Sequence, residues 1–262
     1  MTGTFVERHG VRGGPAVVLI HGLGLNREVW QWTLPALADR YDVLVYDLYG
    51  HGRSDAPPEV PSLSLFSRQL AEVMDTNGIA RAVIVGFSLG GMICRRFAAD
   101  YPDKAAGLAI LNSPHTRTPE AQAAIVKRVD QAAGEGPSAT VEAALERWFT
   151  DAYRAQNPDV MSTVRSWVMA NDIAIYPTIY RVLADGVAEI AGVPLTLPTL
   201  VLTGEEDYGN GPEMTHAIAA EIDGAQALVL PGLRHMALAE DPEAVNTPLR
   251  AFLDRVTGAP GS

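Results

Sequence analysis

The residue best placed for chemistry is Ser88, at the centre of the segment Gly86-Phe87-Ser88-Leu89-Gly90. This Gly-x-Ser-x-Gly pattern follows an apolar run at residues 82–85 and precedes a stretch of helical character at residues 92–99. A serine on a sharp turn between a strand and a helix exposes its hydroxyl, and the flanking glycines remove side chains that would collide there. The pattern predicts a nucleophilic serine. A glycine-rich turn whose serine only caps a helix remains the alternative.

A serine hydroxyl is a weak nucleophile at neutral pH, so it needs a histidine that accepts its proton and a carboxylate that orients the histidine. In hydrolases with a serine on such a turn, the acid and then the histidine follow the serine along the chain. His235 lies in a loop directly after an apolar run at residues 227–230. His216 lies in a stretch of helical character, and His115 is at most a pocket residue. We therefore expect His235 to be the base.

The acid is expected in the loop after the apolar run at residues 199–202. Three carboxylates occur there, on Glu205, Glu206 and Asp207. We choose Asp207, because Gly209 and Gly211 let the chain turn back toward the sheet just after it. The two glutamates are by default solvated loop charges. The run at residues 108–111 is followed by no rival acid.

A second glycine-rich turn, His21-Gly22-Leu23-Gly24-Leu25, follows the apolar run at residues 16–20. Hydrolases of this kind take one amide of the oxyanion hole from such an upstream loop and the other from the residue after the nucleophile. We therefore expect the backbone amides of Leu23 and Leu89 to form an oxyanion hole. His21 is expected to be structural.

The same upstream turn has a competing interpretation as a dinucleotide-binding loop, with Asp47 as the ribose-binding acid. The third glycine of that fingerprint is replaced by Arg27. Ser88 would also have no role in such a protein. The dinucleotide interpretation is therefore much the weaker one, and we expect no cofactor.

Short apolar, β-rich runs alternate with stretches of helical character along the chain. The predicted strands are residues 16–20, 43–46, 82–85, 108–111, 199–202 and 227–230, and the predicted helices are residues 66–76, 92–99, 213–222 and 244–256. Buried parallel strands are near-continuous apolar runs, and their alternation with helices is typical of a doubly wound α/β sheet.

Residues 114–193 lack a convincing strand and carry helical stretches around residues 121–133 and 141–155. An insertion between two strands leaves the sheet intact and places its helices over the strand ends, where ligands bind. We therefore expect one core formed by residues 1–113 and 194–262, with a helical cap at residues 114–193.

The overall composition narrows the possible partners. The chain of 262 residues has 20 Lys and Arg against 31 Asp and Glu, a formal net charge of −11, and no basic run that would follow a phosphate backbone. We expect a small-molecule substrate, no nucleic acid partner, and a monomer or homodimer. The negative net charge does not decide the sign of the substrate, since one arginine in a desolvated pocket can outweigh the long-range field.

The expected location is the cytoplasm. Residues 1–10 lack a basic region followed by an apolar stretch, so no secretory signal is predicted, and no apolar run approaches membrane-spanning length. Cys94 is the single cysteine, so no intrachain disulfide or zinc cluster is expected, which suits a reducing compartment. We expect neither a membrane partner nor a bound metal.

Taken together, the motifs closely resemble the α/β-hydrolase superfamily over nearly the whole chain. They are residues 19–24, 47–54, 86–91 and 204–207, with His235. Within the superfamily, Leu145-Glu146-Arg147-Trp148-Phe149-Thr150 is similar to the cap segment of 3-oxoadipate enol-lactonases. This resemblance implies a small lactone or ester that bears a carboxylate, attack by Ser88, an acyl-enzyme, and then water activated by His235.

The resemblance also implies that Arg147 or Arg165 binds the substrate carboxylate. Solvated arginines on the cap surface are the alternative for each. Trp148 and Trp167, with Met161, Met169 and Tyr176, are candidates for an apolar pocket beneath the cap. Packing between helices is the alternative role for these five residues.

Three classes of function keep this sequence pattern. The first is a serine esterase or lactonase, which we expect. The second is a carbon–carbon bond hydrolase acting on ring-cleavage products. The third is a hydrolase-like binding protein without turnover, which the complete set of candidate catalytic residues disfavours.

Overall fold

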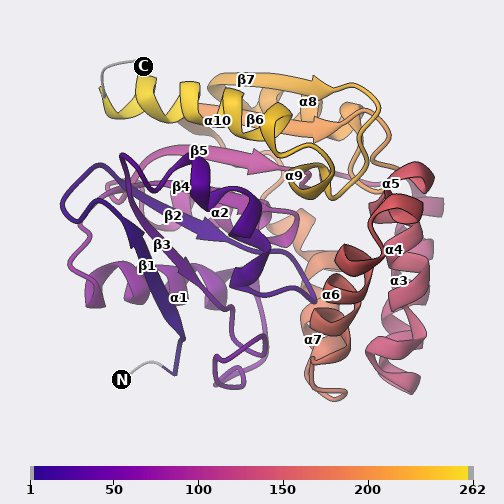
Figure 1. Ribbon diagram of the computed structural model, residues 1–262. Helices are drawn as coiled ribbons and strands as arrows, with labels where there is room; N and C mark the ends of the chain where they lie inside the picture. The colour runs from indigo at the N-terminus through magenta and orange to yellow at the C-terminus, as the bar shows by residue number, and fades with distance from the viewer. Residues whose placement is uncertain (1–2, 259–262) are drawn as a thin grey trace.

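The computed structural model describes residues 3–258, and it contains a seven-stranded sheet in the order β1-β3-β2-β4-β5-β6-β7 (Figure 1). The strands are β1 Val6–Gly10, β2 Ala16–Ile20, β3 Asp42–Tyr46, β4 Ala82–Phe87, β5 Ala105–Leu111, β6 Leu195–Gly204 and β7 Ile222–Leu230. β1 pairs antiparallel with β3, and the other pairs are parallel. The expected doubly wound, mostly parallel sheet is confirmed. Residues 1–2 and 259–262 of the expected core lie outside the described residues.

Helices cover both faces of this sheet. They are α1 Leu63–Thr76, α2 Leu89–Asp100, α8 Pro212–Glu221, α9 Ala237–Glu240 and α10 Pro242–Thr257, with 3-10 helices η1 Arg27–Trp32 and η2 Leu34–Ala36. Side chains alternate along a strand, so Ile20 lies in the core with α1, α2 and α8, whereas Leu19 lies in the core with α10. The interior is thus divided by the sheet into two apolar layers.

β1 has no strand pattern in its sequence and was not predicted. Its five residues include Glu7, Arg8 and His9 and form no apolar run. The strand forms at the free edge of β3, and Arg8 reinforces the pairing by donating to both oxygens of Asp42 at 2.6 and 2.5 Å. A half-buried, charged strand is typical of a sheet edge, where pairing with a neighbour replaces apolar burial.

An inserted segment, residues 114–193, separates β5 from β6. It contains α3 Pro119–Glu135, η3 Pro137–Ala139, α4 Val141–Trp148, α5 Asp151–Gln156, α6 Pro158–Met169, α7 Tyr176–Asp185 and η4 Gly186–Glu189. In Figure 1 the helices α3 to α7 form a group beside the carboxyl ends of the parallel strands, apart from the helices that cover the sheet. These are the residues expected to form a cap.

The helical stretch expected around residues 141–155 is divided into α4 and α5. Phe149 has an extended backbone and a buried side chain, and the hydroxyl of Thr150 then caps α5 by accepting from the Tyr153 amide. The sequence analysis did not delimit α6 and α7. Both carry a proline in the first turn, Pro158 and Pro177, which is a common helix start.

Candidate active site

Ser88 lies in the turn between β4 and α2 with φ 55° and ψ −113°, a conformation that residues with a Cβ rarely adopt. Backbone hydrogen bonds hold the turn. The Ser88 amide donates to Leu111 O at 2.8 Å, and Ser88 O accepts from the Gly91 amide at 3.0 Å and from Ser113 Oγ at 2.9 Å. The Ser88 side chain is thereby fixed at the wall of a cavity.

Two glycines permit this turn. A Cβ on Gly86 would lie 2.2 Å from Gly90 O, and a Cβ on Gly90 would lie 2.2 Å from Ile20 O. Both contacts are with backbone, which cannot move aside as a flexible side chain can. The glycine spacing therefore lets the start of α2 lie directly against β2 and β4.

Asp207 and His235 form a buried pair beside Ser88. His235 Nδ1 lies 2.7 Å from Asp207 Oδ2, which also accepts from Asn112 Nδ2 at 3.0 Å. Asp207 Oδ1 accepts from the backbone amides of Gly209 and Asn210, each at 3.0 Å. The carboxylate has hydrogen-bond partners on both oxygens, so its orientation is fixed.

The charge state of this pair follows from its surroundings. Burial alone would raise the pKa of Asp207, but the charge and hydrogen bond of His235, with hydrogen bonds from Asn112 and the Asn210 amide, lower it below its usual range. Asp207 is therefore a carboxylate at neutral pH and can only accept hydrogen bonds. His235 Nδ1 carries the hydrogen, and Nε2 is left as the basic nitrogen.

The other two carboxylates of the loop lie elsewhere. Glu205 is exposed and accepts from the Gly232 amide at 3.1 Å. Glu206 Oε2 lies 3.7 Å from Arg234 Nε. Of the three acids in this loop, Asp207 alone contacts a histidine within the described residues.

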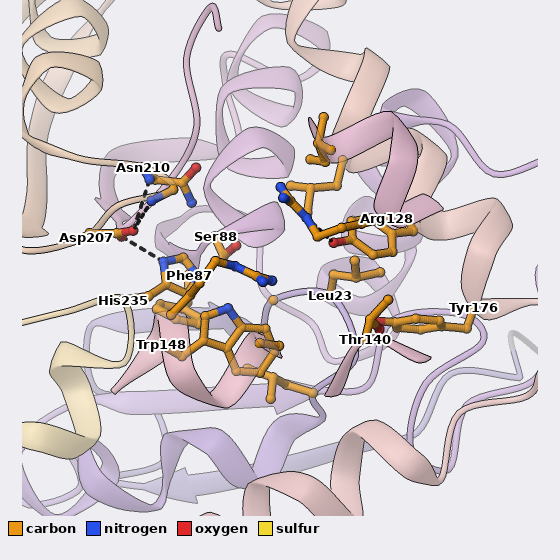
Figure 2. Close-up of a pocket in the computed structure, with 18 of the residues that line it drawn as sticks. Leu23, Phe87, Ser88, Arg128, Thr140, Trp148, Tyr176, Asp207, Asn210 and His235 are labelled. Atoms are coloured by element: carbon orange, nitrogen blue, oxygen red, sulfur yellow. Dashed lines mark hydrogen bonds and ion pairs between the residues drawn. The ribbon is translucent and has the colours of Figure 1, made fainter. Parts of the chain in front are cut away.

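Ser88, Asp207 and His235 line one cavity of about 80 Å³ (Figure 2). The ring centroids of Phe87 and Trp148 lie 5.0 and 6.0 Å from that of His235. Within residues 3–258 no hydrogen bond joins the Ser88 hydroxyl to His235, although both face this cavity. Catalytic hydrogen bonds are often long in ligand-free structures and shorten when the substrate binds.

The upstream glycine turn lies against the turn that carries Ser88. A Cβ on Gly22 would lie 3.1 Å from Ser88 Cβ, and Leu23 lines the cavity. The Leu89 amide is the first of α2, so it has no acceptor within that helix. Backbone donors at Leu23 and Leu89 are thus available close to Ser88.

Two buried histidines support the upstream turn. His51 Nε2 accepts from the Gly24 amide at 3.0 Å, and His21 Nε2 accepts from the Leu48 amide at 2.9 Å. Burial lowers the pKa of His21 to about 4 and that of His51 to about 3. Both are neutral at pH 7, which keeps these nitrogens as acceptors, and His21 has the structural position expected for it.

The structure brings some of the expected pocket residues to the cavity and not others. Arg147 and Trp148 line it, as does Tyr176. Arg165 lies at the surface in an ion pair with Glu142 at 2.6 Å. His115 also lies elsewhere, with Nε2 3.0 Å from Glu221.

The expectation that Trp167 lines this cavity is not met. Its indole nitrogen donates to Glu28 Oε2 at 3.1 Å, and its ring packs edge-on against Trp32 at 6.1 Å between centroids. The reason is the orientation of α6, which directs this side chain toward η1 rather than toward Ser88. Met161 packs in the same apolar layer as Trp167, and Met169 is exposed.

Several residues around the cavity were not singled out from the sequence. Asn112 Nδ2 and the Asn210 amide both donate to Asp207, and Asn210 Nδ2 donates to Asn112 O at 2.8 Å. Asn112 could have been found from the sequence because it directly follows a strand at the ligand-binding edge. Arg117, Arg128 and Tyr180 line the cavity from the inserted segment. Their sequence positions do not distinguish them from solvated helix residues.

Residues 3–258 contain neither a cluster of metal-binding side chains nor a membrane-spanning helix. No group of three or more His, Cys, Asp or Glu side chains in this part of the chain is placed to hold a metal ion. In the same residues, none of the helices is both long enough and apolar enough to cross a membrane.

Comparison with known proteins gives matches along most of the chain. A family model described as the alpha/beta hydrolase fold matches residues 15–242. A protein named (E)-2-((N-methylformamido)methylene)succinate hydrolase, from Acinetobacter baylyi, is 30% identical over 244 residues, or 92% of this chain and 91% of that protein. The 3-oxoadipate enol-lactonase 2 of the same organism is 24% identical over 246 residues, or 92% of this chain and 89% of that protein.

A solved structure is similar at the level of the whole fold. The enol-lactonase from Burkholderia xenovorans LB400 has a TM-score of 0.87 and 29% sequence identity with this chain. The match covers 95% of this chain and 96% of that one. The similarity therefore includes the inserted segment as well as the sheet.

Proposed function

The chain belongs to the α/β-hydrolase fold family, as its motifs led us to expect, and we propose that it is a serine hydrolase that cleaves a small ester or lactone through an acyl-enzyme on Ser88. The observation that carries this proposal is the buried Asp207–His235 pair, with 2.7 Å between Oδ2 and Nδ1, in the same cavity as Ser88 on its strained turn. Such a cluster supplies a nucleophile, a base and an orienting acid.

In the first step, Ser88 Oγ attacks the carbonyl carbon of the substrate while His235 Nε2 takes the hydroxyl proton. Asp207 remains ionised and stabilises the imidazolium that forms. The carbonyl oxygen becomes an oxyanion, which the amides of Leu23 and Leu89 stabilise by hydrogen bonds. These donors contribute most when the negative charge is fully developed, which favours the transition state over the bound substrate.

In the second step, the tetrahedral intermediate collapses and the bond to the leaving oxygen breaks. His235 gives its proton to that oxygen, and the acyl group stays on Ser88. A water molecule then loses a proton to His235 and attacks the acyl carbon. Breakage of the acyl–Ser88 bond releases the carboxylic acid and returns the proton to Ser88.

The inserted segment acts as a cap that closes the substrate site. Trp148 packs beside His235 and supplies an apolar wall, and Arg147 supplies a positive charge in the same cavity. A cation in this position supports a substrate with a carboxylate. Two of the similar proteins are named as enol-lactonases, which supports a lactone substrate.

The proposal is tested by a substrate panel of short p-nitrophenyl esters, enol-lactones and dienoates from ring cleavage. We expect turnover of esters and lactones by the wild-type chain. Ser88→Ala should lose at least about 10³-fold in kcat, as the removal of a serine nucleophile does in general. The matched control Ser166→Ala, at an exposed cap serine, should retain full activity.

Two outcomes would contradict the proposal. Equal activity of Ser88→Ala and wild type would reject the acyl-enzyme on Ser88. Turnover of the dienoates alone, with a carbon–carbon bond broken, would replace the ester or lactone reaction by the carbon–carbon bond hydrolase.

A further inference from the structure

Three arginines of the inserted segment line the cavity that contains Ser88: Arg117, Arg128 and Arg147. Arg117 precedes α3, Arg128 lies within α3, and Arg147 lies in the last turn of α4. All three are half-buried. Figure 2 shows Arg128 on the side of the cavity away from Asp207, with Ser88 between them.

None of these three guanidinium groups has an ion-pair partner within the described part of the chain. The chain has 31 Asp and Glu residues, so acidic partners are plentiful. Most of the other arginines in the described residues form an ion pair with one of them. The paired arginines are Arg8, Arg27, Arg40, Arg68, Arg95, Arg96, Arg154, Arg165, Arg181, Arg234 and Arg250. Asp207 is the carboxylate among the described residues that line the cavity, and its oxygens are already bonded to His235, Asn112 and backbone amides, so the three guanidinium groups have no paired carboxylate there.

Neutral acceptors hold two of these side chains in place. Arg117 donates from Nη1 to Ala184 O at 3.1 Å and from Nη2 to Leu183 O at 3.3 Å. Arg128 donates from Nε to Tyr180 Oη at 3.1 Å. Carbonyl and phenol oxygens fix the positions of the guanidinium groups without cancelling their charges.

Like charges also act on one another across the cavity. Burial, and then the charge of Arg128, lower the pKa of Arg117 to about 10, and the same two causes lower the pKa of Arg147. Glu146 and Asp185 act on them in the opposite direction but more weakly. Arginine side chains are not deprotonated in proteins, so these like charges repel one another, and a bound anion relieves the repulsion.

We propose that this cavity binds a small substrate with two carboxylate groups, which Arg117, Arg128 and Arg147 hold while the bond to be cleaved lies against Ser88. One carboxylate neutralises a single guanidinium and leaves two like charges buried beside each other. Two carboxylates lower the summed charge of the three guanidinium groups and the ligand to about +1, against about +2 with one carboxylate. A cavity of this small size favours a compact substrate over a long acyl chain. The position of the reacting bond rests on the proposed function, whereas the recognition of two carboxylates does not.

The experiment measures binding to Ser88→Ala protein by calorimetry, so that turnover plays no part. The probes are malonate, succinate and glutarate, the monocarboxylates propionate and butyrate, and sulfate, all at one ionic strength. We expect the best dicarboxylate to bind about ten- to hundredfold more tightly than either monocarboxylate, since a second charge-assisted contact adds that much.

Variants of the cluster give the second readout. Arg128→Gln and Arg147→Gln, each combined with Ser88→Ala, should lower the dicarboxylate affinity to about that of a monocarboxylate. Arg147 makes no hydrogen bond within the described residues, so its removal tests the site without removing a structural contact. The matched control is Arg165→Gln, on the surface of the same segment, which should leave binding unchanged.

Equal affinities for mono- and dicarboxylates would overturn the proposal. It would also be overturned if the control Arg165→Gln lost as much dicarboxylate affinity as Arg128→Gln. Tighter binding of sulfate than of every dicarboxylate would replace it with a site for a tetrahedral anion. Dicarboxylate binding by a protein that hydrolyses no ester or lactone would reject the proposed function and leave this inference standing.

Discussion

At Ser88 the backbone conformation and the chemistry of the side chain depend on each other. A positive φ at a residue with a Cβ costs about 1–3 kcal/mol, and it persists only where the surroundings fix it. Here the Ser88 amide is bound to Leu111 O and its carbonyl to Ser113 Oγ. These hydrogen bonds hold the strained conformation, which places Ser88 in the wall of the cavity that Leu23 also lines.

Asp207→Asn should lower kcat by about 10³- to 10⁴-fold, because an amide at this position no longer fixes the Nδ1–H tautomer of His235. The measurement is steady-state hydrolysis of a p-nitrophenyl ester. Glu205→Gln and Glu206→Gln are the controls from the same loop, and both should stay within about twofold of wild type, because neither carboxylate contacts His235. An Asp207→Asn variant as active as wild type would reject the assignment of the acid.

At the scale of the elements, the loop that carries His235 is joined to α4. The Met236 amide donates to Trp148 O at 2.8 Å, and Arg234 Nη1 donates to Glu146 O at 3.0 Å and to Phe149 O at 2.8 Å. These contacts flank His235 on both sides in the sequence. The part of the inserted segment that bears Arg147 and Trp148 is therefore held in a fixed position relative to His235.

Gly86→Ala should prevent the nucleophile turn from forming, since the added Cβ would lie 2.2 Å from Gly90 O. We expect a loss of at least about 3 kcal/mol in the free energy of unfolding, measured by urea denaturation. Gly134→Ala is the matched control, because a Cβ there has no neighbour within 4 Å and lies in α3. It should leave stability unchanged or raise it by up to about 1 kcal/mol. Equal stability of the two variants would show that the turn can accommodate a Cβ at residue 86, and that the close approach of β4 and α2 does not limit stability.

The elements differ in how far the sequence predicts them. Strands such as β2 and β4 are apolar throughout because both faces are buried, so local sequence is enough to find them. β1 depends on the free edge of β3, a tertiary feature with no local pattern. The position of Trp167 depends on the rotation of α6 against η1, which periodicity does not define.

For the whole molecule, one rule of topology explains why residues 88, 207 and 235 line the same cavity. Ser88, Asp207 and His235 follow β4, β6 and β7, and parallel strands place their carboxyl ends along one edge. The sequence order of the strands and the motifs after them therefore predicts this part of the site. The arginine cluster comes from the inserted segment, whose helix packing has no comparable rule.

The buried histidines predict a pH dependence of stability. His21 and His51 have native pKa values of about 4 and 3, below the unfolded value of about 6.5. Below pH 6.5 the unfolded chain therefore binds protons that the native chain does not, and stability falls as the pH falls. Each histidine contributes about 1.4 kcal/mol per pH unit where only the unfolded state is protonated.

Urea denaturation between pH 7 and pH 5 measures this effect in a range above the titration of ordinary carboxylates. His51→Gln retains a side-chain acceptor for the Gly24 amide and removes one titrating group. Its slope with pH should therefore be smaller than that of wild type by about 1 kcal/mol per pH unit. An unchanged slope in this variant would show that His51 is not the source of the acid sensitivity.

The central claim is that Ser88 becomes acylated during turnover, and covalent labelling tests it most directly. Intact-protein mass spectrometry after treatment with a fluorophosphonate should show one added phosphonyl group on the wild-type chain and on Ser166→Ala, and none on Ser88→Ala. Peptide mapping should place the group on residue 88. Normal labelling of Ser88→Ala, or a label on another residue of the wild-type chain, would contradict the account.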